Sequence, residues 1–209
     1  MKRVETWWLP AGDTHIELYL QAYGGEYQRE HRRASLSACR RRRVALDIGA
    51  HVGLWSRDLA EAFEEVLAFE PVAAFRQCFV RNVTAQNVTL YPFALGSARG
   101  KAKMAVAADN SGESHIAEAG QESVDIRPLD ELDLNDVDYV KMDVEGFELF
   151  VLQGARETLM RCRPVITLEQ KAHSATHFGI GQYAALEYLK ALGAEVRERV
   201  IDDWILVWP

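Results

Sequence analysis

The sequence predicts an α/β fold with one mostly parallel β-sheet, helices on both faces and an antiparallel last strand. Short apolar runs alternate with helix-like stretches along most of the chain. The first such run leads into a glycine-containing turn, and a tight connection at Asp202 and Asp203 separates the last two. Such alternation is typical of α/β proteins, and so short a connection joins strands that run in opposite directions.

The composition indicates a single globular domain. The chain has 209 residues, of which 48% are hydrophobic and 26% charged, and this balance excludes disordered, fibrous and collagen-like proteins. A chain of this size buries roughly 70% of its unfolded surface, so its core needs no disulfide or metal. No apolar run reaches the ~18 residues of a membrane span, and the start lacks a signal-peptide core. We therefore expect a cytoplasmic protein with no membrane partner.

Charge and cysteine content exclude further classes. The net charge of −7 argues against bulk electrostatic binding to nucleic acids or anionic membranes. Cys39, Cys78 and Cys162 are far apart and odd in number, which fits neither a disulfide framework nor a zinc site. We expect them to be reduced thiols.

Residues 1–43 are predicted to form an extension that covers the functional site, and residues 44–209 form the domain itself. Polar and apolar residues alternate from His15 to Leu20, which predicts a strand or hairpin outside the sheet. The basic segment that follows, Arg29–Arg43, is predicted to be helical.

The basic segment has two interpretations. It carries seven arginines and Glu30 as its only opposing charge. One interpretation is a solvated helix face with Leu36 and Cys39 turned inward. The other is a docking patch for a phosphorylated, sulfated or polyanionic partner. No aromatic residues interleave with the arginines, so the segment alone does not indicate recognition of single-stranded nucleic acid.

Apolar runs predict the strands of the domain. Val44–Ile48 and Glu65–Phe69 end in Gly49 and Glu70, as expected of buried parallel strands. The further strands are expected, in order, at Val88–Phe93, Lys101–Ala107, Tyr139–Met142, Pro164–Leu168, Glu195–Val200 and Trp204–Trp208.

Apolar residues three or four positions apart predict the helices. Gly193 can adopt the left-handed conformation that closes the last one. The stretch 108–123 is polar and rich in small residues, which predicts a long irregular loop with a functional role. The expected helices are Trp55–Phe63, Phe75–Val83, Phe147–Gly154, Ala155–Arg161 and Gln182–Leu192.

The strongest functional signal is VALDIGAHVGLWS at residues 44–56. An apolar strand leads to Asp47, and glycines at 49 and 53 allow the backbone to approach a ligand closely. The next strand ends in Glu70, whose carboxylate can accept hydrogen bonds from both hydroxyls of a ribose. The pattern indicates a nucleoside-containing cofactor, and its alternative is a plain strand-to-helix turn.

Charge favours S-adenosylmethionine among such cofactors. A dinucleotide places its pyrophosphate at a helix N-terminus, where the carboxylate of Asp47 would repel it. S-adenosylmethionine carries a sulfonium and an ammonium group, which suit Asp47. No Gly-Lys-Ser/Thr follows the glycines, which excludes a P-loop.

A series of motifs between residues 44 and 170 resembles the FkbM-type S-adenosylmethionine-dependent methyltransferases. In chain order they are DIGAHVG, FEP, NVTLYPFALGSARG, KMDVEGFE, VLQGA and RPVITLE. The resemblance implies the class I methyltransferase (Rossmann-like) fold, with a seven-stranded sheet whose last strand is antiparallel. It also implies that residues 44–209 bind S-adenosylmethionine.

The resemblance implies a set of cofactor contacts. The loop after the first strand surrounds the methionine part, Glu70 binds the ribose, and the adenine lies near Phe93 and Ala94. His51 is expected either to contact the substrate or to pack within the loop, and Trp55 to enter the core. The predicted cofactor-binding residues are Asp47, Gly49, Ala50, His51, Gly53, Glu70, Phe93, Ala94 and Asp143.

Asp143 and Glu145 are the predicted catalytic residues. Asp143 ends a core strand, at the edge of the sheet where α/β proteins bind ligands. Methyl transfer to a hydroxyl requires removal of its proton while donor and acceptor are held in contact. We predict that these carboxylates orient or deprotonate the acceptor. Their alternatives are an Asp143 that binds the cofactor's ammonium and a Glu145 that caps the next helix.

Neighbouring polar residues offer other chemistry. Glu169 ends the adjacent strand and, with Asp143 and either Gln170 or Asp109, would offer oxygen ligands to Mg²⁺ or Ca²⁺. A divalent metal is nevertheless not expected, and no metal ligand is assigned. His115 and His173 are alternative bases.

We therefore expect an enzyme that moves a methyl group from S-adenosylmethionine to an oxygen of a small molecule, sugar or glycan. One alternative is a nucleic-acid methyltransferase that uses the basic segment. The other is a non-catalytic S-adenosylmethionine-binding module, because fold alone does not establish activity.

Overall fold

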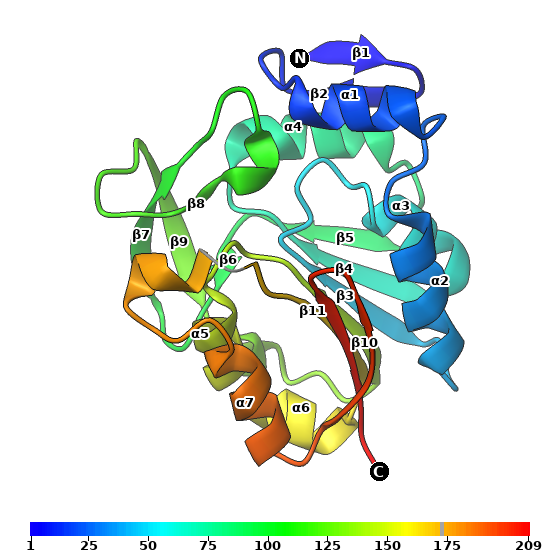
Figure 1. Cartoon of the computed structure of the whole chain (residues 1–209), viewed down its shortest axis with the longest axis vertical. Helices are drawn as coiled ribbons and strands as arrows, with labels where there is room; N and C mark the ends of the chain where they lie inside the picture. The colour runs from blue at the N-terminus through cyan, green and yellow to red at the C-terminus, as the bar shows by residue number, and fades with distance from the viewer. Residues whose placement is uncertain (172–173) are drawn as a thin grey trace.

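The computed structural model describes residues 1–171 and 174–209. Its centre is a seven-stranded sheet in the order β12-β13-β11-β10-β3-β4-β5 (Figure 1). Strand β13 is antiparallel to both of its neighbours, while β4, β3, β10 and β11 pair in parallel. The predicted α/β fold with an antiparallel last strand is therefore confirmed. The strands are β3 (Val44–Ile48), β4 (Glu65–Phe69), β5 (Val88–Tyr91), β10 (Val137–Met142), β11 (Val165–Glu169), β12 (Glu195–Val200) and β13 (Asp203–Val207).

Both faces of the sheet are covered because its central strands carry buried apolar residues on both faces. In β3, Leu46 and Ile48 belong to the core under one face, whereas Ala45 packs into a second core with Trp55 and Leu59. Alternate residues of a strand point to opposite faces, so each face gains its own hydrophobic layer. The helices are α2 (Arg29–Ala38), α3 (Ser56–Ala62), α4 (Ala73–Asn82), α5 (Glu148–Gln153), α6 (Arg156–Cys162) and α7 (Ala184–Ala191), with short 3₁₀ turns η2 (Leu129–Leu132) and η3 (Ser174–Phe178).

The N-terminal segment differs from the prediction. His15–Leu20 is not a strand but part of helix α1 (His15–Ala22), and the hairpin lies earlier, in β1 (Lys2–Val4) and β2 (Trp7–Leu9). Ile16 and Leu20 are both buried and lie four residues apart, a spacing that suits a helix face. The Asp13 carboxylate also accepts the backbone N–H of Ile16 at 2.8 Å, which satisfies a free donor of the first turn.

A second, four-stranded sheet in the order β6-β9-β7-β8 was not predicted. The predicted strand Lys101–Ala107 belongs to it, and the stretch 108–123 is less irregular than expected, since it contains the short turn η1. Polar residues dominate these strands because one face is open to solvent, which hides the apolar signal. The elements are β6 (Ala94–Leu95), β7 (Gly100–Ala105), η1 (Ser111–Glu113), β8 (His115–Ile116) and β9 (Glu122–Arg127).

None of the helices that the structure describes combines the length and apolar character needed to cross a membrane. Cys39, Cys78 and Cys162 are free thiols, as expected.

Candidate cofactor and acceptor site

The loop between β3 and α3 makes a tight turn at the carboxyl edge of the sheet. Gly49 has a φ of +78°, and a Cβ there would lie 1.9 Å from the backbone oxygen of Asp143. Only glycine fits, because its conformation is left-handed and the end of β10 approaches so closely. His51, with a φ of +51°, continues the turn.

Glu70, at the end of β4, holds this loop in place. Its two carboxylate oxygens accept the backbone N–H groups of His51 at 2.9 Å and Val72 at 2.7 Å. Burial raises the pKa of Glu70 to about 7, although both amides favour its charged form. Each oxygen retains a lone pair, so the carboxylate can still accept hydrogen bonds from a ligand.

Asp47 lies at the base of the same loop and is fully buried. Its Oδ2 accepts the Ser56 hydroxyl at 2.6 Å, whereas its Oδ1 has no hydrogen-bond partner among the described residues. Lys141 of β10 is also buried, with its Nζ 3.7 Å from Asp47 Oδ1 and 3.5 Å from Asp143 Oδ2. The negative charge of Asp47 is therefore partly balanced, which weakens the charge argument made from the sequence.

A cavity of about 290 Å³ opens beside these residues. Seven of the nine predicted cofactor-binding residues line it, and the remaining two, Gly53 and Phe93, are not among its lining residues. Gly53 instead packs against Phe79 and Val83, and the Phe93 ring lies against Phe69 in the core. The lining residues from the prediction are Asp47, Gly49, Ala50, His51, Glu70, Ala94 and Asp143.

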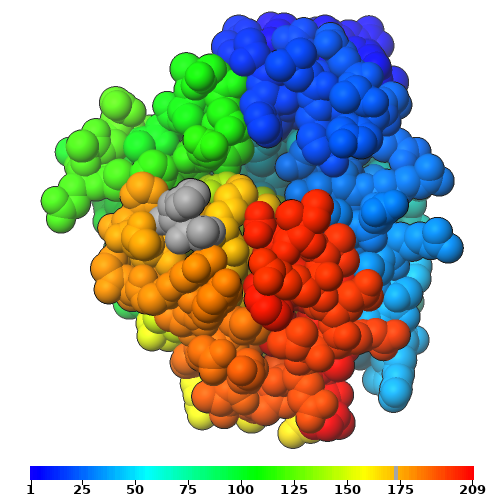
Figure 2. Space-filling model, in the orientation of Figure 1, coloured from blue at the N-terminus to red at the C-terminus, as the bar shows by residue number. Residues whose placement is uncertain are grey.

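The N-terminal segment and η1 cover the cavity. His15 and Ile16 line it from α1, and residues 110–114 line it from the region of η1. The backbone N–H groups of Thr14 and His15 both donate to the Asp109 carbonyl oxygen, which joins the two segments. Figure 2 shows the blue N-terminal residues against the green residues of this region. We refer to residues 108–116 as the roof.

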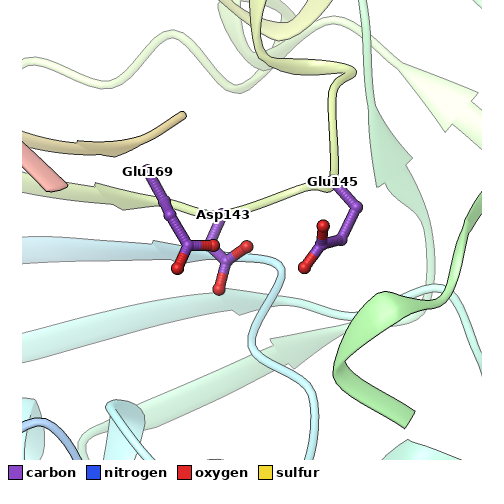
Figure 3. Close-up of side chains that lie close together, drawn as sticks. All are labelled: Asp143, Glu145 and Glu169. Carbon is purple, nitrogen blue, oxygen red and sulfur yellow. The ribbon is translucent and has the colours of Figure 1, made fainter. Parts of the chain in front are cut away.

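Three carboxylates, two of which line the cavity, lie close together (Figure 3). Asp143, Glu145 and Glu169 each offer an oxygen within 4.8 Å of the other two. The third member is therefore Glu145, not Gln170 or Asp109. The Gln170 amide instead donates to the Gln182 carbonyl oxygen.

Two lysines determine the charges of these carboxylates. Lys141 and Lys171 hold the pKa of Asp143 well below its usual range, even though burial acts in the opposite direction. Burial and the nearby charge of Asp143 raise the pKa of Glu169 well above its usual range. Burial and the Asp143 charge also raise the pKa of Glu145.

The other candidates that the structure describes do not belong to this cluster. His115 stacks on His177 with their ring centroids 4.4 Å apart, and His173 lies outside the described residues. In the basic segment, Arg32 pairs with Asp58 and Arg43 with Asp138. Arg40, Arg41 and Arg42 are exposed.

A comparison with protein families decides the assignment. Residues 47–197 match the profile of the methyltransferase FkbM domain, which covers more than half of the chain. This chain belongs to the FkbM methyltransferase family. The predictions of the family and of a methyltransferase that uses S-adenosylmethionine are thus confirmed. A search of curated proteins found no match.

Solved structures share the fold of this FkbM methyltransferase. An FkbM methyltransferase from Methylobacillus flagellatus is 20% identical with a TM-score of 0.57, and the match covers 80% of this chain but only 44% of that one. A putative rRNA-methylase from Clostridium thermocellum is 12% identical with a TM-score of 0.54, over 85% and 92% of the two chains. A putative methyltransferase from Streptococcus mutans, solved with SAH, is 10% identical with a TM-score of 0.51, over 85% and 93%.

The FkbM site contains residues that the sequence reasoning missed. Lys141 could have been found from the sequence, since a lysine among the apolar residues that end a core strand is unusual. Lys171 and Tyr27 line the cavity near the carboxylates without belonging to any recognised motif. Asp13 and Ser111 are 98 residues apart in the chain and hydrogen-bond each other in the fold. No local pattern could reveal that contact.

Proposed function

We propose that this FkbM methyltransferase transfers the methyl group of S-adenosylmethionine to a hydroxyl oxygen of a small molecule, sugar or glycan. The observation that carries the proposal is that Asp143 and Glu145 line the same cavity as the loop Gly49–His51. Carboxylates beside a bound methyl donor are suited to removing the proton of a hydroxyl acceptor.

The residues present fit the cofactor. Asp47 Oδ1 is buried without a hydrogen-bond partner in the described structure, so it can accept an N–H of the cofactor's ammonium group. Glu70 keeps one lone pair on each oxygen for the ribose hydroxyls. When bound, S-adenosylmethionine supplies an electrophilic methyl group on a sulfonium centre.

We assign different tasks to the two catalytic carboxylates. Glu145 receives the acceptor proton, since its raised pKa makes it a stronger base than a carboxylate in water. Asp143 stays ionised between two lysines and orients the acceptor. The acceptor oxygen forms a bond to the methyl carbon as the carbon–sulfur bond breaks, and the proton ends on Glu145.

The N-terminal extension, residues 1–43, is our candidate for acceptor selection. His15, Ile16 and Tyr27 bring it to the cavity, and segments that border a site at the surface commonly set its specificity. Residues 44–209 then form the cofactor-binding domain. The cytoplasm stays the expected location.

Calorimetry with S-adenosylmethionine and, separately, NAD tests the cofactor assignment. We expect micromolar binding of the first alone and loss of that binding in Asp47→Ala and Glu70→Ala. Asp125→Ala is the matched control, because Asp125 is exposed on β9 and its nearest ion-pair partner, Lys101, lies 3.8 Å away. Binding of neither compound, or of NAD alone, would contradict the assignment.

An acceptor screen with labelled methyl then tests the reaction. It includes hydroxyl compounds, glycans and RNA, so that label on RNA would favour the nucleic-acid alternative over ours. Asp143→Asn and Glu145→Gln are expected to lose turnover much more than cofactor affinity. Unchanged turnover in both variants would contradict the assigned roles, and no labelled product in any arm would favour a binding module.

A further inference from the structure

The Lys171 ammonium lies inside the carboxylate cluster. Its Nζ donates to Glu145 Oε1 and is 3.1 Å from Glu169 Oε2. Asp143 completes the cluster. Lys171 therefore contacts two members of the one group of three carboxylates that the described chain brings within metal-binding distance.

The surrounding charges keep this lysine protonated. Burial lowers the pKa of Lys171, but the carboxylates of Asp143, Glu169 and Glu145 outweigh burial and raise it overall. Its side chain remains 36% exposed and lines the cavity. The ammonium is thus fixed by the protein and still accessible to a ligand.

Lys171 and Lys141 serve different parts of the site. Lys141 is buried, donates to the Gly49 carbonyl oxygen at 3.1 Å and lies between Asp47 and Asp143, beside the cofactor loop. Lys171 instead contacts Glu169 and Glu145, and the proposed function makes Glu145 the proton acceptor. Of these two lysines, Lys171 is therefore the one whose positive charge lies beside the proposed proton acceptor.

We propose that Lys171 is a catalytic residue, the built-in cation of the acceptor site, which binds the acceptor oxygen where a divalent metal would otherwise act. This inference rests on the proposed function. As the acceptor proton passes to Glu145, negative charge develops on the oxygen, and a positioned cation stabilises it. The oxygen–methyl bond forms while the carbon–sulfur bond breaks, and Lys171 keeps its proton throughout.

One consequence does not depend on activity. A divalent ion has to displace the Lys171 ammonium to reach Glu145 and Glu169. When the ammonium is removed, three oxygen ligands are left without their cation, which is the donor set that hard divalent ions prefer. Loss of Lys171 should therefore create a metal site.

Titration of the purified full-length chain with Mn²⁺, followed by the electron paramagnetic resonance signal of free Mn²⁺, tests this consequence. Lys171→Met is expected to bind Mn²⁺ at least about tenfold more tightly than the wild type. Lys190→Met is the matched control, since Lys190 pairs with Glu187 on α7 and should leave binding unchanged. Equal binding by Lys171→Met and the wild type would overturn the proposal. Thermal melts of each variant confirm folding.

Kinetics test the catalytic role with an acceptor from the screen. Lys171→Met should lower kcat by about 100-fold, shift the pH profile of kcat upward and leave S-adenosylmethionine affinity unchanged. Lys171→Arg should recover part of the rate because it restores the positive charge. An active wild type with unchanged kcat in Lys171→Met would overturn the role. An inactive wild type would instead refute the proposed function and, with it, the catalytic role of Lys171, and the Mn²⁺ titration would then report only whether the ammonium excludes a metal from the carboxylates.

Discussion

Ser111 Oγ in the roof lies 2.8 Å from His51 Nε2 in the cofactor loop. The same hydroxyl donates to the Asp13 carboxylate, so it must accept from an Nε2–H of His51. Burial lowers the pKa of His51 to about 4, so the ring is neutral at pH 7. A buried chain of hydrogen bonds thus joins the extension, the roof and the loop that Glu70 holds.

Ser111→Ala should loosen the roof and weaken the binding of S-adenosylmethionine. The substitution removes two buried side-chain hydrogen bonds, and we expect affinity to fall by about 5- to 30-fold, through faster dissociation. Stopped-flow fluorescence of Trp55, which lines the cavity, measures that rate. Ser37→Ala on the exposed face of α2 is the control. An unchanged dissociation rate in Ser111→Ala would show that the roof does not retain the cofactor.

Most of the central sheet could be predicted because its strands carry local signals. Val44–Ile48 and Glu65–Phe69 carry apolar residues on both faces, and the structure has both strands with these bounds. The prediction of a strand at His15–Leu20 was wrong, because alternation over six residues also fits a helix that turns Ile16 and Leu20 inward. The second sheet was missed because strands such as Glu122–Arg127 are largely polar.

The sequence could predict those site residues that lie at the ends of recognisable strands. Asp143 and Glu169 end adjacent strands, and parallel strands bring their carboxyl ends to one edge. Lys171 was not predictable as a member of the cluster, because its contact with Glu145 spans 26 residues and depends on two loops. The Ser111–Asp13 contact likewise needs the folded chain.

Glu148→Gln should change how stability depends on pH. Burial raises the pKa of Glu148 to about 7, so the folded protein holds a proton that the unfolded chain releases near pH 4.5. The protonated Glu148 side chain therefore contributes fully to the free energy of unfolding below pH 4.5. This contribution is lost as the pH rises through 7. Relative to the wild type, the variant should therefore gain about 2–3 kcal/mol in free energy of unfolding between pH 5 and 8. Urea unfolding measures this difference.

The control for Glu148 is Glu157→Gln, an exposed site on α6. Its stability should follow the wild type at every pH. A constant offset between Glu148→Gln and the wild type from pH 5 to 8 would show that Glu148 does not titrate in this range.

Lys141→Met should destabilise the fold, more at high pH than at low pH. It leaves the buried Asp47 and the half-buried Asp143 without their shared cation, and breaking a buried ion pair typically costs about 3–5 kcal/mol. Burial already raises the pKa of Asp47, and loss of the Lys141 charge raises it further, so stability falls as pH rises. Urea unfolding at pH 5 and 8 tests this, with the exposed Lys103→Met as control. An equal loss at both pH values would contradict the ion-pair account.

Gly49→Ala and Gly193→Ala separate backbone strain from close approach. Both glycines have positive φ, +78° and +102°, but a Cβ at Gly193 meets nothing within 4 Å, whereas at Gly49 it meets the Asp143 backbone. Gly193→Ala should therefore cost only about 1–2 kcal/mol of unfolding free energy from conformation alone. Gly49→Ala should cost more than about 3 kcal/mol, and displacement of Asp143 should also weaken S-adenosylmethionine binding. If urea unfolding gave equal losses, the contact between the loop and β10 would not be the reason for glycine at position 49.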